Sequence, residues 1–174
     1  MAEPWTELPT DEAPAADERT TLMAFLDYQR VVLARKAEGL TEEQARIEGC
    51  PPSDLTLLGL IRHMADVERN WSQQSFMGAT VGPIYYGPAH PDGDEDGDFH
   101  PPPDATVAEA LETYWAEIKE ADRIYAAGSL DDIERRDRAS YTLRWILVHL
   151  IEEYARHCGH ADLIRQNIDG ATGD

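Results

Sequence analysis

Residues 140–168 read SYTLRWILVHLIEEYARHCGHADLIRQNI, and this stretch determines how the rest of the chain is interpreted. It predicts one long helix, because it contains no proline and its only interior glycine is Gly159. Apolar residues recur along one side of that helix at intervals that fit a turn of 3.6 residues. They are Leu143, Ile146, Leu150, Ile164 and Ile168.

Ionisable residues interrupt this apolar side in the middle of the helix. Spaced four, four and three residues apart are His149, Glu153, His157 and His160. The inward side of a helix is its driest part, and a charge there is costly unless it is paired or binds a metal. The His149–His160 ladder is therefore the main functional signal in the sequence.

Three further amphipathic segments predict helices. The first begins near residues 18–21, the second follows a cap at Ser53 or Asp54, and the third opens with the capping box Thr106–Glu109. Glycine accommodates the left-handed conformation in which many helices end. The three expected ends are Gly39, Gly78 and Gly128.

Four amphipathic helices of this length predict an all-α four-helix bundle. We expect a single domain over residues 18–170, preceded by an N-terminal arm over residues 1–17. Residues 79–104 form a long loop rich in Gly, Pro and Asp between the second and third helices. A loop of this length is usually a functional lid or a disordered insert. The order in which the helices pack is left open.

The chain of 174 residues has 34 acidic and 15 basic residues, a formal net charge of −19. This charge argues against binding to nucleic acid or to anionic membrane surfaces. Cys50 and Cys158 suggest no disulfide framework, and neither a secretory signal nor a membrane-spanning segment is predicted. We expect a cytoplasmic protein, monomeric or homodimeric, that acts on a small molecule.

A metal site is the leading interpretation of the ladder. Glu153 and His157 are four residues apart, a spacing that brings Cβ atoms to ~5–6 Å and lets both side chains share one ion. His63 on the second predicted helix shares the inward side of that helix and provides a third ligand. Such a His2Glu set leaves a coordination position open, as in catalytic zinc sites.

His149 and His160 have supporting roles in this interpretation. Either would be a fourth ligand, or a partner that fixes the tautomer of a coordinating imidazole. The alternative is a hydrogen-bonded polar network of Glu153 and the histidines with no metal.

Two other candidate sites are rejected. The acidic run from Asp92 to Asp98 reproduces the first half of an EF-hand loop, but Pro103 stands where the motif needs Glu. We interpret it as an acidic, solvated loop. Cys158 directly follows His157, so it points ~100° away on the helix and is interpreted as a small packed residue.

The segments LLGLIRHMADVERNW (57–71) and HLIEEYARHCGHADLIRQ (149–166) resemble the DinB-like superfamily and, more closely, its DUF664 branch. The resemblance implies a four-helix bundle with a divalent metal, zinc or nickel, held by one residue of the second helix and two of the last. His63 and His157 match ligand positions. Glu153 stands where many DinB-like proteins have His, and matches the Glu ligand of the related mycothiol-dependent maleylpyruvate isomerases.

The resemblance also implies chemistry with a low-molecular-weight thiol such as mycothiol or bacillithiol. We hypothesise a metal-dependent thiol S-transferase or isomerase in which His63, Glu153 and His157 hold the metal. In this hypothesis the catalytic residues His160 and His149 orient a ligand or move a proton. The alternatives are a binding protein with a structural metal held by four residues, and a metal-free bundle that acts through partners.

Overall fold

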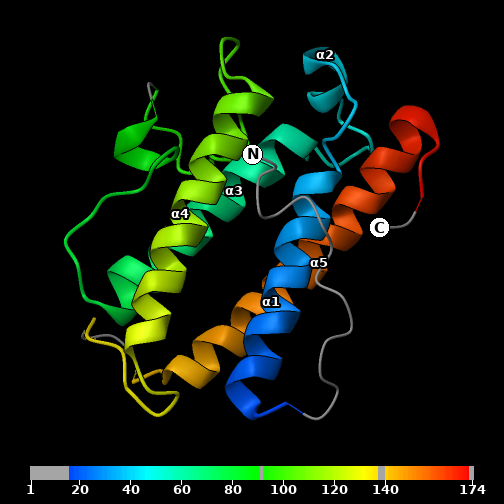
Figure 1. Cartoon of the computed structure of the whole chain (residues 1–174). Coiled ribbons are helices and arrows are strands. Elements are labelled where there is room, and N and C mark those ends of the chain that lie inside the picture. The colour runs from blue at the N-terminus through cyan, green and yellow to red at the C-terminus, as the bar shows by residue number, and fades with distance from the viewer. Residues whose placement is uncertain (1–15, 91, 137–139, 173–174) are drawn as a thin grey trace.

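The computed structural model describes residues 16–90, 92–136 and 140–172 (Figure 1). The long helices are α1 (Glu18–Arg35), α3 (Leu57–Arg69), α4 (Val107–Ala127) and α5 (Leu143–Asp169). The shorter ones are α2 (Glu42–Ala45), the π-helix η1 (Asn70–Phe76), which continues α3, and the 3-10 turn η2 (Gly87–Ala89). Within the described ranges, β pairing is limited to one isolated bridge. The predicted all-α bundle is confirmed, while residues 1–15 of the predicted arm lie outside the described residues.

Capping chemistry sets the helix boundaries. The predicted box at α4 is present: the Thr106 hydroxyl accepts a hydrogen bond from the backbone N–H of Glu109, whose carboxylate accepts one from the N–H of Thr106. α3 is capped by Thr56, so the prediction of Ser53 or Asp54 was wrong. The Ser53 hydroxyl instead accepts a hydrogen bond from the N–H of Leu55, within the preceding turn.

The last helix begins later than predicted. Its N-cap is Thr142, whose hydroxyl accepts a hydrogen bond from the N–H of Trp145. Ser140 has a φ of 36° and cannot continue a right-handed helix, and Thr142 pairs with Ile133 in the isolated bridge. The first helix also ends earlier, at Arg35, and turns lead from there to Gly39.

The helices pack in two parallel pairs. At the start of α1, Glu18 pairs with Arg144 near the start of α5; past the end of α1, Lys36 pairs with Asp162 near the end of α5. These two helices therefore run in the same direction. α3 and α4 form the other parallel pair, and α3 runs opposite to α5 (Figure 1). The long loop must return along the bundle to join the end of η1 to the start of α4.

A buried ion pair lies where the four long helices meet. Arg30 and Glu68 are 1% and 0% exposed, and the guanidinium donates two hydrogen bonds of 2.8 and 2.9 Å to the carboxylate. Arg30 also donates to Asp122, and the hydroxyl of Tyr154 donates to Glu68. The Tyr114 hydroxyl donates to the backbone oxygen of Arg30. These contacts connect α1, α3, α4 and α5 through one network.

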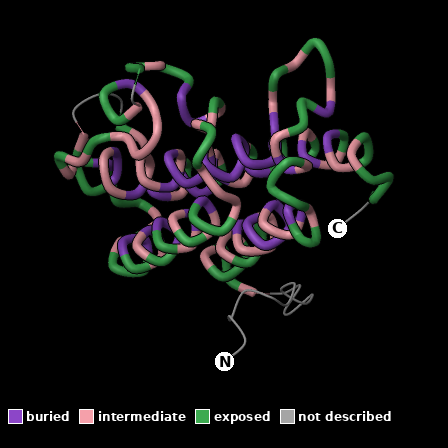
Figure 2. Tube along the Cα trace, turned by 90° about the horizontal axis from the view of Figure 1, so that it is seen from above, coloured by how far each residue is buried: buried purple, intermediate pink, exposed green. Residues whose placement is uncertain are grey.

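Burial follows the facing sides of the helices. In Figure 2 buried residues run along the inside of the bundle, and exposed residues cover its outer sides. None of the helices in the described part of the chain is long and apolar enough to cross a membrane. Most buried apolar residues therefore lie where the helices pack together.

Candidate metal centre

His63 of α3 lies beside Glu153 and His157 of α5, where these antiparallel helices face each other. One ligand atom of each residue lies within 4.8 Å of the others. Nε2 of His157 is 3.7 Å from Oε2 of Glu153, and the ring centroids of His63 and His157 are 4.8 Å apart. His157 is buried, and the other two are half-buried. We call these three residues the triad; the fold brings the three predicted ligand residues within reach of one ion.

Asp98, from the long loop, orients the imidazole of His63. Its Oδ2 lies 2.7 Å from Nδ1 of His63, and Asp98 is only 6% exposed. Phe99 stacks on the same ring with centroids 4.2 Å apart. A carboxylate on one nitrogen of a histidine fixes the tautomer and leaves the other nitrogen for a metal.

Asp98 is the residue of the site that sequence reasoning missed. The interpretation of residues 92–98 as a solvated acidic loop is wrong at this position, because Asp98 is buried against His63. Phe99, a large apolar residue directly after the acidic run, is the signal that would have indicated a buried contact here.

The loop is attached to α3 close to the triad. The carboxylate of Asp66 accepts hydrogen bonds from the N–H groups of Ile84 and Tyr85, at 2.6 and 3.0 Å. Burial raises the pKa of Asp66 to about 6 despite these two bonds. Arg62 lies 3.8 Å from the centroid of the Tyr85 ring and donates to the backbone oxygen of Asp98. The loop predicted as a lid therefore packs over the helix that carries His63.

His157 is held in the form that binds metals. Burial, followed by the neighbouring imidazoles of His63 and His160, lowers the pKa of His157 to about 3. It is therefore neutral at pH 7, and a metal has no proton to displace from it. Nδ1 of His160 lies 3.4 Å from Nδ1 of His157, on the opposite ring nitrogen from the one that faces Glu153.

His149 lies on the other side of Glu153, one turn earlier in α5. Its Nε2 is 3.6 Å from Oε1 of Glu153. Its ring stacks on Trp145 with centroids 5.0 Å apart and meets the edge of Trp71 at 4.7 Å. Thus α5 presents an unbroken series of contacts along the predicted ladder.

A second group of ligand-type side chains consists of His149, Glu152 and Glu153. Arg156 forms ion pairs with both of these carboxylates, at 2.9 Å from Oε1 of Glu153. A guanidinium therefore already offsets part of the negative charge of this group, while Oε2 of Glu153 remains on the side of His157.

Cys158 is buried, as predicted, and lies away from the triad. Its thiol donates to the backbone oxygen of Gln29, and burial raises the pKa of the thiol to about 12. A protonated thiol is a poor nucleophile and a poor ligand. Cys158 lines a hollow of about 310 Å³ between α1 and α5.

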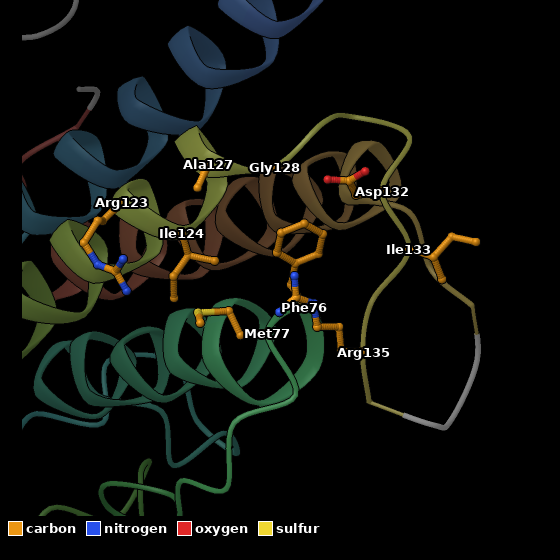
Figure 3. A pocket seen from close by; sticks show the side chains of 9 residues that line it. All are labelled: Phe76, Met77, Arg123, Ile124, Ala127, Gly128, Asp132, Ile133 and Arg135. Atoms are coloured by element: carbon orange, nitrogen blue, oxygen red, sulfur yellow. The ribbon is translucent and has the colours of Figure 1, made fainter.

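A larger hollow of about 360 Å³ lies between the ends of η1 and α4 and the connection that follows α4 (Figure 3). Its lining includes Phe76, Met77, Ile124 and Arg135. No residue of the triad lines this hollow or the one beside Cys158.

Comparison with known protein families identifies the chain. The family model for mycothiol-S-transferase matches residues 21–170, which include the triad, the whole of α3, α4 and α5, and all but the first three residues of α1. No curated protein sequence matches the chain. A match over most of the chain, together with the all-helical fold, shows that this chain belongs to the mycothiol-S-transferase family, a DinB-like family.

Proposed function

We propose that the protein is a metal-dependent S-transferase or isomerase that uses a low-molecular-weight thiol such as mycothiol. A divalent metal, zinc or alternatively nickel, would be held by His63, Glu153 and His157. The observation that carries this proposal is the convergence of three ligand atoms within 4.8 Å from two helices. Three protein ligands leave a coordination position for a substrate, whereas structural zinc sites use four.

A bound metal would deprotonate the thiol that coordinates it and so supply a thiolate nucleophile at neutral pH. The residues of the chain prepare this site. Asp98 orients His63 through the 2.7 Å contact, and burial keeps His157 neutral. The carboxylate of Glu153 offsets part of the charge of a divalent ion.

The two remaining ladder residues would act as catalytic groups. We propose that His160 orients the ring of His157, because Nδ1 of His160 lies 3.4 Å from Nδ1 of His157. We assign proton transfer to His149, which is half-buried beside Glu153. His149 is not among the three residues proposed to hold the metal.

Metal content tests the site directly. Protein purified without an affinity tag should contain about one divalent ion per chain. His157→Ala should lose that ion and the gain in thermal stability that added zinc gives. The matched control is His100→Ala, because His100 is exposed on the loop and pairs with Asp94 instead.

Thiol conjugation to a panel of electrophiles, assayed with the metal-loaded protein, then tests the reaction. The metal proposal is wrong if the untagged protein contains no ion and His157→Ala responds to zinc as the unchanged protein does. A loaded protein that excludes every thiol from its metal would instead indicate a structural ion.

A further inference from the structure

Arg136 contacts η1, the π-helix that continues α3 beyond His63. It belongs to the connection between α4 and α5, and Nη1 donates to the side-chain oxygens of Asn70 and Gln74 at 3.2 and 3.3 Å. Both acceptors are neutral, and Arg136 forms no ion pair with any residue that the structure describes. Among the described residues, the side-chain acceptors of this half-buried guanidinium are thus neutral amides, in a chain of net charge −19.

The backbone holds Arg136 in place. Its N–H donates to the backbone oxygen of Ser75 at 3.1 Å, so the residue is fixed directly to η1. Its neighbour Arg135 turns to the other side and lines the hollow of Figure 3. A planar guanidinium held in this way is suited to bind a carboxylate through two hydrogen bonds.

The π-helix η1 supplies both contacts of Arg136. Asn70 and Gln74 belong to it, and π-helical turns are uncommon and frequently occur at functional sites. Asn70 follows His63 by seven residues, which corresponds to a rise of ~10 Å along the helix. Asn70, which contacts the guanidinium, therefore lies about two turns from His63.

Aromatic rings lie beside the triad and beside Asn70, the contact of Arg136. We call Trp71, Tyr141, Trp145 and His149 the aromatic strip. Trp71 meets His149 at 4.7 Å and Trp145 at 5.6 Å, and Tyr141 stacks on Trp145 at 4.0 Å. Trp71 directly follows Asn70, and Trp145 is 42% exposed, so part of this strip is accessible to a ligand.

We propose that Arg136, positioned by Asn70 and Gln74, binds an anionic group of the molecule whose reacting end occupies the triad. The aromatic strip lies against the body of that molecule. The ligand class is an organic carboxylate with ~10 Å between its reacting atom and its charge, as the helical rise from His63 to Asn70 requires. This inference rests on the proposed function and narrows its substrate or thiol.

Two thiols of equal length test the inference. The cobalt(II)-loaded protein is titrated with 6-mercaptohexanoate and with neutral 6-mercaptohexan-1-ol, and cobalt–sulfur absorption reports binding. The carboxylate should bind the unchanged protein about tenfold more tightly. Arg136→Gln should bring the ratio close to one, whereas Arg135→Gln, which removes the same charge from the neighbouring residue, should keep it.

The metal-free protein separates this inference from the proposed function. Absence of a cobalt–sulfur band with either thiol would sink the thiol chemistry alone. Ligand-observed NMR with the metal-free protein should still show preference for the carboxylate, and Arg136→Gln should remove it. Equal affinity for the two probes in both protein forms, or an equal loss in Arg135→Gln, would overturn the role of Arg136.

Discussion

His63 is the residue of α3 that contacts both the long loop and α5. Asp98 contacts its Nδ1, Phe99 covers one face of the ring, and His157 lies 4.8 Å away between ring centroids. A carboxylate that accepts a hydrogen bond from a coordinating imidazole makes that imidazole a better ligand. The strength of the proposed metal site therefore depends on a residue 35 positions away in the chain.

Asp98→Asn should weaken zinc binding about 10- to 100-fold, because an amide orients the imidazole but cannot stabilise it as a carboxylate does. Competition with a chromogenic chelator measures the affinity. Asp94→Asn is the matched control: Asp94 makes a 2.6 Å contact with His100 in the same loop, away from the triad. Equal zinc affinities of the two variants would contradict the assigned role of Asp98.

At the scale of elements, α3 and α5 each contain an interior glycine, and only the one in α3 lacks space for a side chain. A Cβ at Gly59 of α3 would lie 2.6 Å from the backbone oxygen of Phe99, so the loop needs glycine to approach the helix. A Cβ at Gly159 of α5 would meet nothing within 4 Å. One glycine therefore serves the docking of the loop, and the other only reduces helix stability.

Gly59→Ala should lower the free energy of unfolding by ~1–3 kcal/mol, the usual cost of overpacking. Gly159→Ala should raise it by ~0.5–1 kcal/mol, because alanine is the better helix former. Urea unfolding of the metal-free protein measures both. A stabilisation by Gly59→Ala equal to that of Gly159→Ala would show that the loop does not pack against α3 in solution.

For the whole molecule, the pair Arg30–Glu68 ties the four long helices together. Burying both charges has a desolvation cost that the bidentate contact and the Tyr154 hydroxyl offset. The pair is therefore expected to select this packing arrangement more than to increase its stability, since an apolar pair can fill the same space.

Glu68→Gln should lower the free energy of unfolding by ~3–5 kcal/mol, because it removes the fully buried counter-charge of Arg30 and leaves only the partly exposed carboxylates of Asp27 and Asp122. Arg30→Met combined with Glu68→Leu should recover much of that loss. Chemical denaturation is the measurement, and Arg123→Ala is the control, since its pair with Glu120 is exposed and screened by solvent and should contribute little. A loss in Glu68→Gln no larger than in the control would contradict a central role for the pair.

Features that depend on nearby residues could be predicted from the sequence. The capping box at Thr106 and the end of α4 at Gly128 are local, and both are as expected. The caps of α3 and α5 were misplaced by a few residues, because several Ser, Thr and Asp residues competed for each position. The π-helix at Asn70 was not predicted, since periodicity alone does not separate it from a continued α-helix.

The sequence by itself determined the helices and the shared face of Glu153 and His157 on α5, because turns of 3.6 residues fix which side chains lie on one side of a helix. The approach of His63 to that pair required the packing of α3 against α5. Only the tertiary structure decided the order of the helices, the contact of Asp98 with His63, and the seating of Arg136 on Asn70. These contacts join loops to distant helices, and loops have no periodicity from which a facing direction follows. Their geometry arises only when the whole bundle packs.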